Sequence, residues 1–191
     1  MSHEMSKSHN ARYRNGDYEH IRGRVLDVGC GPDKIVLPPP HEVVGWDLPD
    51  GDAQYLATLG DASFDTVVSG HCLEHMHDVP TALLNWARVL KEGGYLYILV
   101  PSWQFYERCQ WPSRCNPDHK ASFDLIDPAV RPAHPFYGMK EMRTLGKACG
   151  LELVDARMEL DQYEIGKTWD KELDQTQYGA LAQCCFIYLK A

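Results

Sequence analysis

The sequence lacks a long hydrophobic run, a cluster of basic residues and an apolar leader. Its longest apolar runs, such as Tyr95 to Val100, have the length of a strand, so no membrane-spanning helix is expected. The opening Met-Ser-His-Glu-Met-Ser-Lys has no apolar core of the kind found in a signal peptide. With 19 Lys and Arg against 27 Asp and Glu, the formal net charge of -8 disfavours binding to nucleic acid or to an anionic membrane.

The cysteines also lack the pattern of a disulfide framework. There are seven, an odd number, and no two are spaced as Cys-x-x-Cys. Five of them stand in apolar surroundings: Cys30, Cys72, Cys149, Cys184 and Cys185. Buried, reduced thiols are typical of a cytoplasmic protein, which is the expected location.

The length of 191 residues and a hydrophobic content of 44% are enough for one core. A single domain over residues 1–191 is therefore expected. Residues 1–22 are mostly polar and predict a loose N-terminal arm that holds at most a short helix near Tyr18 to Ile21.

Short runs rich in apolar residues that end at glycine, proline or a polar residue predict six strands, the first of them buried. The runs are Val25–Val28, Val43–Trp46, Thr66–Ser69, Tyr95–Val100, Leu151–Met158 and Gln183–Lys190. Two helices are expected between them. One begins after the capping residue Asp78 and is stopped by Gly93, and the other spans Lys140–Cys149.

Strands that alternate with helices predict a mostly parallel α/β sheet, covered on both faces as the middle of three layers. The last two strands have no crossover helix between them, so an antiparallel strand is expected at the sheet edge. Three successive prolines at 38–40 prevent a long helix between the first two strands. The fold should therefore be abbreviated there.

The strongest motif is Val-Leu-Asp-Val-Gly-Cys-Gly-Pro at residues 25–32. It places the acid Asp27 at a strand end, followed by a glycine turn that lets backbone approach a ligand closely. A dinucleotide fingerprint would need a glycine where Lys34 stands, so NAD is disfavoured. Asp47 ends the next strand, where a carboxylate typically binds ribose hydroxyls.

Together these motifs resemble the class I S-adenosylmethionine-dependent methyltransferases, over residues 24–102. Further matches are Gly-Trp-Asp (45–47), Gly-Asp-Ala (51–53), Ser-Phe-Asp-Thr-Val-Val (63–68), Cys-Leu-Glu-His (72–75) and Val-Leu-Lys-Glu-Gly-Gly-Tyr-Leu (89–96). The resemblance implies a Rossmann-like fold and S-adenosyl-L-methionine as cofactor. The implied cofactor-binding residues are Asp27, Gly29, Cys30 and Gly31 at the methionine end, Asp47 and Leu48 at the ribose, Asp52 and Ala53 at the adenine, and Ser69, Gly70 and His71 near the methyl group.

The chain departs from the family pattern in two places. Asp33 stands where the family often has a third glycine that opens a long helix. Asp47 and Asp52 are too close in sequence for the usual helix and strand between them. The cofactor pocket should therefore be abbreviated on one side.

Residues 102–137 form a long polar and aromatic segment after the fourth predicted strand, and it resembles a compact subgroup of the same enzymes. We expect it to form the acceptor site and lid, with a structural loop as the alternative. The predicted substrate-binding residues are Tyr106, Glu107, Trp111, Asn116 and Lys120. His119 is the first candidate for a general base, oriented by Asp118, and His71 is the second.

The histidine-rich stretch at residues 71–78 could suggest a metal site, but spacing alone does not place its side chains on one face. No metal ligands are predicted. The expected function is methyl transfer to a small polar acceptor, a hydroxyl of a sugar or natural-product-like molecule, by a monomer or homodimer. The alternatives are a non-catalytic S-adenosylmethionine-binding protein and a metal-dependent hydrolase built on these histidines. The sequence does not identify the acceptor.

Overall fold

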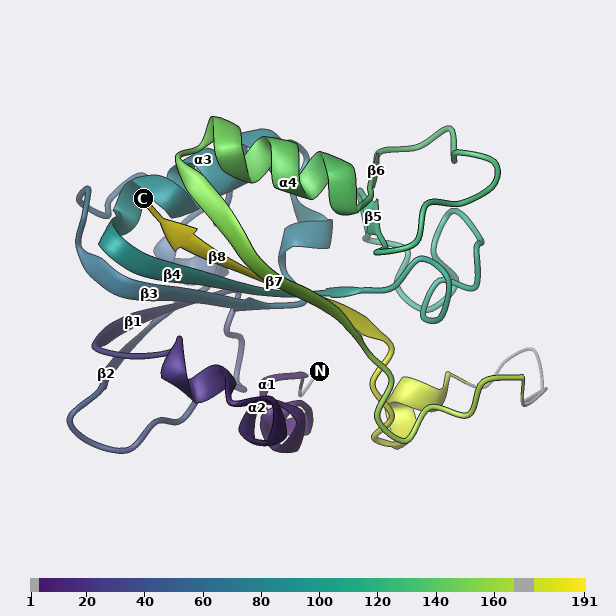
Figure 1. Cartoon of the computed structure of the whole chain (residues 1–191), viewed down its shortest axis with the longest axis horizontal. Helices are drawn as coiled ribbons and strands as arrows, with labels where there is room; N and C mark the ends of the chain where they lie inside the picture. The colour runs from purple at the N-terminus through teal and green to yellow at the C-terminus, as the bar shows by residue number, and fades with distance from the viewer. Residues whose placement is uncertain (1–3, 167–173) are drawn as a thin grey trace.

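The computed structural model describes residues 4–166 and 174–191, and a six-stranded mixed sheet lies at its centre (Figure 1). The strand order is β2-β1-β3-β4-β8-β7. The bounds are Arg24–Val28 (β1), Glu42–Trp46 (β2), Phe64–Gly70 (β3), Leu90–Pro101 (β4), Leu151–Glu159 (β7) and Gln183–Lys190 (β8). The first four strands are parallel, and β8 is antiparallel to both β4 and β7. The predicted mostly parallel sheet with an antiparallel pair at its edge is confirmed.

Helices cover both faces of this sheet, so the predicted three layers are also confirmed (Figure 1). On one face lie α3 (Val79–Val89) and α4 (Met139–Ala148). On the other lie the short helices α1 (Glu4–Lys7) and α2 (His9–Asn15) and the 3₁₀ turn η1 (Asp17–Glu19). Alternate residues of the central strands enter two apolar clusters, one on each face, as the two-residue period of a strand requires.

The prediction for the start of α3 is confirmed, whereas the prediction for its end is wrong. Asp78 accepts a hydrogen bond from the backbone N–H of Thr81 and caps the helix. The helix ends at Val89 and not at Gly93, because Leu90 already pairs with Phe64 of β3 as the first residue of β4. Sheet pairing ends the helix before the glycine is reached.

The expectation of a loose N-terminal arm is also wrong. Met5, Arg12 and Asp17 are all buried, and Tyr97 of β4 donates a hydrogen bond to Asp17 across 2.9 Å. The predicted helix near residues 18–21 is the turn η1, displaced slightly toward the N-terminus. The arm is ordered because it covers the face of the sheet on which the sequence provides no crossover helix.

The abbreviation after the first two strands is as expected. The chain from β1 to β2 contains no helix, and between β2 and β3 it forms only the 3₁₀ turn η2 (Leu48–Asp50). The segment after β4 contributes a small parallel pair, β5 (Ser122–Phe123) and β6 (Phe136–Tyr137). The remaining short elements are the 3₁₀ turns η3 (Leu73–His75) and η4 (Gln175–Tyr178). In the described chain, no helix is both long and apolar enough to cross a membrane.

Candidate functional site

A cavity of about 520 Å³ lies where β1, β2 and β3 end. Ligands of parallel α/β sheets bind at this edge, beyond the carboxyl ends of the strands. The cavity is lined by Gly29, Asp47, Leu48, Gly51, Asp52, Ala53, His71, Cys72, His75, Met76 and Asp118. Its wall therefore combines the two strand-end motifs with residues of the histidine-rich stretch.

The glycine turn after β1 separates this cavity from a smaller one of about 130 Å³. Gly29 lines both, and it has a left-handed conformation with φ of 72°. Its N–H donates to the carbonyl of Trp46 across 2.8 Å, which ties the turn to the end of β2. The smaller cavity is also lined by Cys30, Gly31 and Gly70, together with residues of α1. The glycine turn predicted to hold the methionine end of the cofactor therefore borders two adjoining cavities, and α1 covers the smaller one.

Two of the predicted cofactor residues line neither cavity. Asp27 is fully buried, and its Oδ2 accepts a hydrogen bond from the backbone N–H of Ile35 across 2.6 Å. Its Oδ1 has no hydrogen-bond partner within the described residues. Ser69 is also fully buried in β3. Neither side chain is therefore exposed to either cavity in this structure.

Burial gives Asp27 a measurable effect on stability, because it raises the pKa of this carboxyl from 3.8 to about 7. Between these pH values the unfolded chain releases the proton and the folded chain keeps it, so stability falls as pH rises. The full difference corresponds to roughly 4 kcal/mol at 1.36 kcal/mol per pKa unit. Urea unfolding at pH 4.5 and pH 8 should show most of this loss, about 3 kcal/mol, in the wild type and a smaller one in Asp27→Asn. An unchanged pH dependence in the variant would contradict the assignment.

The second strand-end motif also lines the larger cavity. Asp47 accepts a hydrogen bond from the N–H of Leu48 across 2.8 Å and caps η2. Asp52 accepts one from the N–H of Gln54, also across 2.8 Å, and so shapes the next turn. The predicted ribose and adenine residues therefore share one wall, although the usual helix between them is missing.

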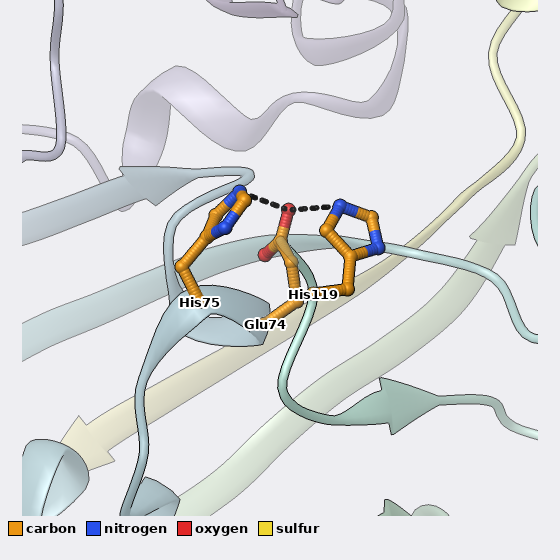
Figure 2. Close-up of side chains that lie close together, drawn as sticks. All are labelled: Glu74, His75 and His119. Atoms are coloured by element: carbon orange, nitrogen blue, oxygen red, sulfur yellow. Dashed lines mark ion pairs between the residues drawn. The ribbon is translucent and has the colours of Figure 1, made fainter. Parts of the chain in front are cut away.

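Three histidines surround the carboxylate of Glu74 at the other side of the cavity. Glu74 Oε1 lies 3.8 Å from His71 Nδ1, 4.0 Å from His75 Nε2 and 3.9 Å from His119 Nε2. Figure 2 shows His75 and His119 on either side of Glu74, each with one ring nitrogen toward it. Burial raises the pKa of Glu74 well above its usual value and lowers the pKa values of His71 and His75.

The second ring nitrogen of each histidine is held by a side-chain oxygen. His71 Nε2 bonds Gln183 Oε1 across 2.9 Å, and His75 Nδ1 bonds Asp118 Oδ2 across 3.0 Å. His119 Nδ1 bonds Glu107 Oε1 across 2.5 Å. The prediction that Asp118 orients His119 is therefore wrong. Asp118 is 69% exposed at its side chain and binds His75 and Lys120, whereas the buried Glu107 orients His119.

The other predicted substrate residues divide into two groups. Tyr106 stacks on His119 with ring centroids 5.8 Å apart, so it joins Glu107 at the histidine group. Trp111 stacks instead on His134 at 3.8 Å, and Asn116 accepts a hydrogen bond from the N–H of Asp118 within its own turn. These two residues have structural contacts in the loop.

Sequence reasoning missed Glu74 and Gln183 as members of this site. The sequence places Glu74 only within the histidine-rich stretch at residues 71–78 and predicts no role for it. It does not predict that the long loop brings His119 to this glutamate. No pattern in the sequence links Gln183 of β8 to His71.

Comparison with known proteins shows which proteins this chain is similar to. A family model described as a methyltransferase domain matches residues 41–98. The trans-aconitate 2-methyltransferase of Mycolicibacterium gilvum is 28% identical over 166 residues, which cover 74% of this chain. The match spans 60% of the length of that curated relative. The shared sequence thus includes the strand-end motif of β2, β3 and the histidine-rich stretch.

Solved structures of methyltransferases have a fold similar to that of this chain. An S-adenosylmethionine-dependent methyltransferase from Archaeoglobus fulgidus aligns over 99% of this chain and 95% of its own, with a TM-score of 0.59 and 19% identity. A second, from Methanosarcina mazei, covers 91% of this chain and 96% of its own, with a TM-score of 0.55 and 17% identity. At such identities the likeness shows the fold, and the strand order and antiparallel β8 described above belong to it.

Proposed function

We propose that this chain is a class I S-adenosylmethionine-dependent methyltransferase and that it methylates a hydroxyl group of a small polar molecule, of the sugar or natural-product type. The observation that carries this proposal is the 520 Å³ cavity. One wall holds the strand-end carboxylates, and the other holds imidazoles that can accept a proton. Its volume is within the usual range for sites that bind small molecules.

The residues present fit the cofactor. The carboxylates of Asp47 and Asp52 face a cavity that Gly29 joins to the glycine turn, and the unpartnered Asp27 Oδ1 beneath the turn offers a further acceptor. In the proposal Asp47 holds the ribose, Ala53 lies near the adenine, and the turn residues hold the methionine end. S-adenosylmethionine supplies a methyl carbon attached to a sulfonium, which is already an excellent leaving group.

The protein then has to orient the acceptor and take its proton. A hydroxyl needs a base, and imidazole has a suitable resting pKa. We assign this role to His71, which follows β3 and lines the cavity, whereas His119 has only 2% of its side chain exposed. Because His71 Nε2 donates to Gln183, the lone pair of Nδ1 is the one free to accept the proton. Tyr106 lies edge-on to His71, with ring centroids 6.4 Å apart, and borders the acceptor.

Binding of the product analogue tests the cofactor half of the proposal. S-adenosylhomocysteine should bind with a dissociation constant in the micromolar range, about 8 kcal/mol, and NAD far more weakly. Asp47→Asn should weaken S-adenosylhomocysteine by roughly 1–3 kcal/mol, because a neutral amide replaces an acceptor of charge-assisted hydrogen bonds. The amide oxygen can still accept from Leu48, so the η2 cap survives.

Isothermal titration calorimetry measures both ligands. Asp61→Asn is the matched control, because Asp61 is an exposed carboxylate outside the cavity lining and should bind like the wild type. Tighter binding of NAD than of S-adenosylhomocysteine would refute the proposal. Wild-type affinity in Asp47→Asn would move ribose recognition to another residue.

Turnover separates the enzyme from a non-catalytic cofactor-binding protein, the alternative that the abbreviated β1–β2 region favours. The protein is incubated with S-adenosylmethionine and panels of sugars, polyols and hydroxylated natural products. Formation of S-adenosylhomocysteine that depends on an acceptor supports methyl transfer. Tight binding without consumption over the whole panel would favour the non-catalytic alternative.

A further inference from the structure

Glu74 is a buried carboxylate without a neighbouring cation from Lys or Arg in the described chain. Its side chain is 1% exposed, and neither carboxylate oxygen has a hydrogen-bond partner there. An uncompensated buried charge is strongly unfavourable. The other buried acidic cluster, Asp17 with Glu159, contains the guanidinium of Arg157 and is already compensated. Glu74 is therefore stable either as the neutral acid or with a bound cation in place of its proton.

The groups around Glu74 are electron-pair donors that face one another. His75 and His119 each donate through Nδ1 to a carboxylate, so the lone pair on Nε2 of each points to Glu74. At 4.0 and 3.9 Å, the distances from Nε2 to Glu74 Oε1 exceed those of a hydrogen bond. Ligand atoms of the three side chains all lie within 4.8 Å of one another (Figure 2). A small cation bonded at about 2.0–2.2 Å to each would bridge them after a modest inward shift.

The surroundings have the form that metal-binding histidines require. A histidine ligand almost always donates its second ring N–H to a carboxylate, a carbonyl or water, which fixes the ring and raises its basicity. Asp118 does this for His75, and Glu107 does it for His119. Two histidines on separate segments, each with its own carboxylate and both facing a third one, form a set that a purely structural packing role does not need.

We propose that Glu74, His75 and His119 bind a divalent first-row transition-metal ion. Two imidazoles and one carboxylate suit zinc or iron(II), and three protein ligands leave coordination positions open. His75, which lines the 520 Å³ cavity, marks the side from which the ion is reached. This inference goes beyond the proposed function. It departs from the sequence-based expectation, which considered residues 71–78 together and did not place His119 beside them.

Direct metal binding tests the proposal without any need for an acceptor. Wild-type protein made without a polyhistidine tag is stripped with a chelator and titrated with Co²⁺, whose visible absorption reports nitrogen and oxygen ligands, and with Zn²⁺ by calorimetry. One equivalent should bind with micromolar or better affinity. Glu74→Gln should weaken Co²⁺ binding at least 100-fold. His134→Gln, on the same long loop but hydrogen-bonded to Ser122, is the matched control and should bind like the wild type.

A variant of Glu107, which orients the proposed ligand His119, gives a second readout. Glu107→Gln should lower Co²⁺ affinity by about 10–100-fold, because the ring of His119 loses its anionic partner. Failure of the wild type to bind either ion would overturn the proposal, as would equal affinity in folded Glu74→Gln. S-adenosylhomocysteine binding is measured on the same samples. Metal binding without S-adenosylhomocysteine binding would refute the proposed function alone, and the reverse result would refute only the metal site.

Discussion

Gly29→Ala is expected to destabilise the protein by roughly 2–5 kcal/mol and to abolish S-adenosylhomocysteine binding. The left-handed φ of 72° makes any side chain there unfavourable by roughly 1–2 kcal/mol. An added Cβ would also lie 2.5 Å from both Cβ and Sγ of Cys72, and such overpacking costs a further ~1–3 kcal/mol. Since Cys72 lines the same cavity, relief of the clash must move the turn or η3, and either movement distorts the site.

Urea unfolding and calorimetry on the same protein check this expectation, with Gly150→Ala as control. Gly150 has nearly the same φ, 75°, and no atom within 4 Å of an added Cβ, so only the conformational penalty should appear. Equal losses in the two variants would mean that the contact with Cys72 is unimportant. The double variant Gly29→Ala/Cys72→Gly should recover the part of the loss that is due to the clash.

His71→Ala should lower turnover with a hydroxyl acceptor by about 10²–10⁴-fold, the usual contribution of a general base. S-adenosylhomocysteine affinity should change little, because the acceptor rather than the cofactor depends on His71 Nδ1. The imidazole is fixed for this task by Gln183, which itself donates to Glu159 across 2.7 Å. The readout is the initial rate of methyl transfer to whichever acceptor the turnover screen identifies, measured beside calorimetry on the same variant.

The matched control for this variant is His134→Ala, a histidine that stacks on Trp111 and lies outside the cavity lining. It should keep the wild-type rate. Full activity in His71→Ala would mean that His119 is the general base or that the acceptor needs no base. A large loss of S-adenosylhomocysteine affinity in folded His71→Ala would instead place His71 in the cofactor site.

Most of the sheet could be predicted from the sequence because its inner strands are largely buried on both faces and give short apolar runs. The two ends of such a strand are harder to place. Leu90, for example, enters the sheet directly from a helix, and nothing in its neighbourhood marks the change. The N-terminal arm was misjudged for a different reason. Its polar composition conceals single buried residues, Met5 and Arg12, whose burial depends on a sheet face formed by distant parts of the chain.

The same distinction applies to the candidate site. The residues that line the cavity from β1 and β2 follow directly after strands, so their place at one sheet edge follows from the topology. The position of His119 depends on two backbone hydrogen bonds, from the N–H groups of Lys120 and Ala121 to the carbonyl of Glu74. These contacts join a long irregular loop to η3. No periodicity or local motif in the sequence predicts these hydrogen bonds. The pairing of His119 with Glu107 was therefore missed.

The covering of one sheet face by the N-terminal helices has a consequence for how the protein folds. In most α/β domains, crossover helices close a face with neighbouring segments of chain. Here Met5 shares an apolar cluster with Cys185 and Ile187 of β8, near the other end of the chain. That half of the core is complete only when the last strand joins the sheet. Contacts of such long sequence separation slow folding, so this face is the part of the protein that assembles late.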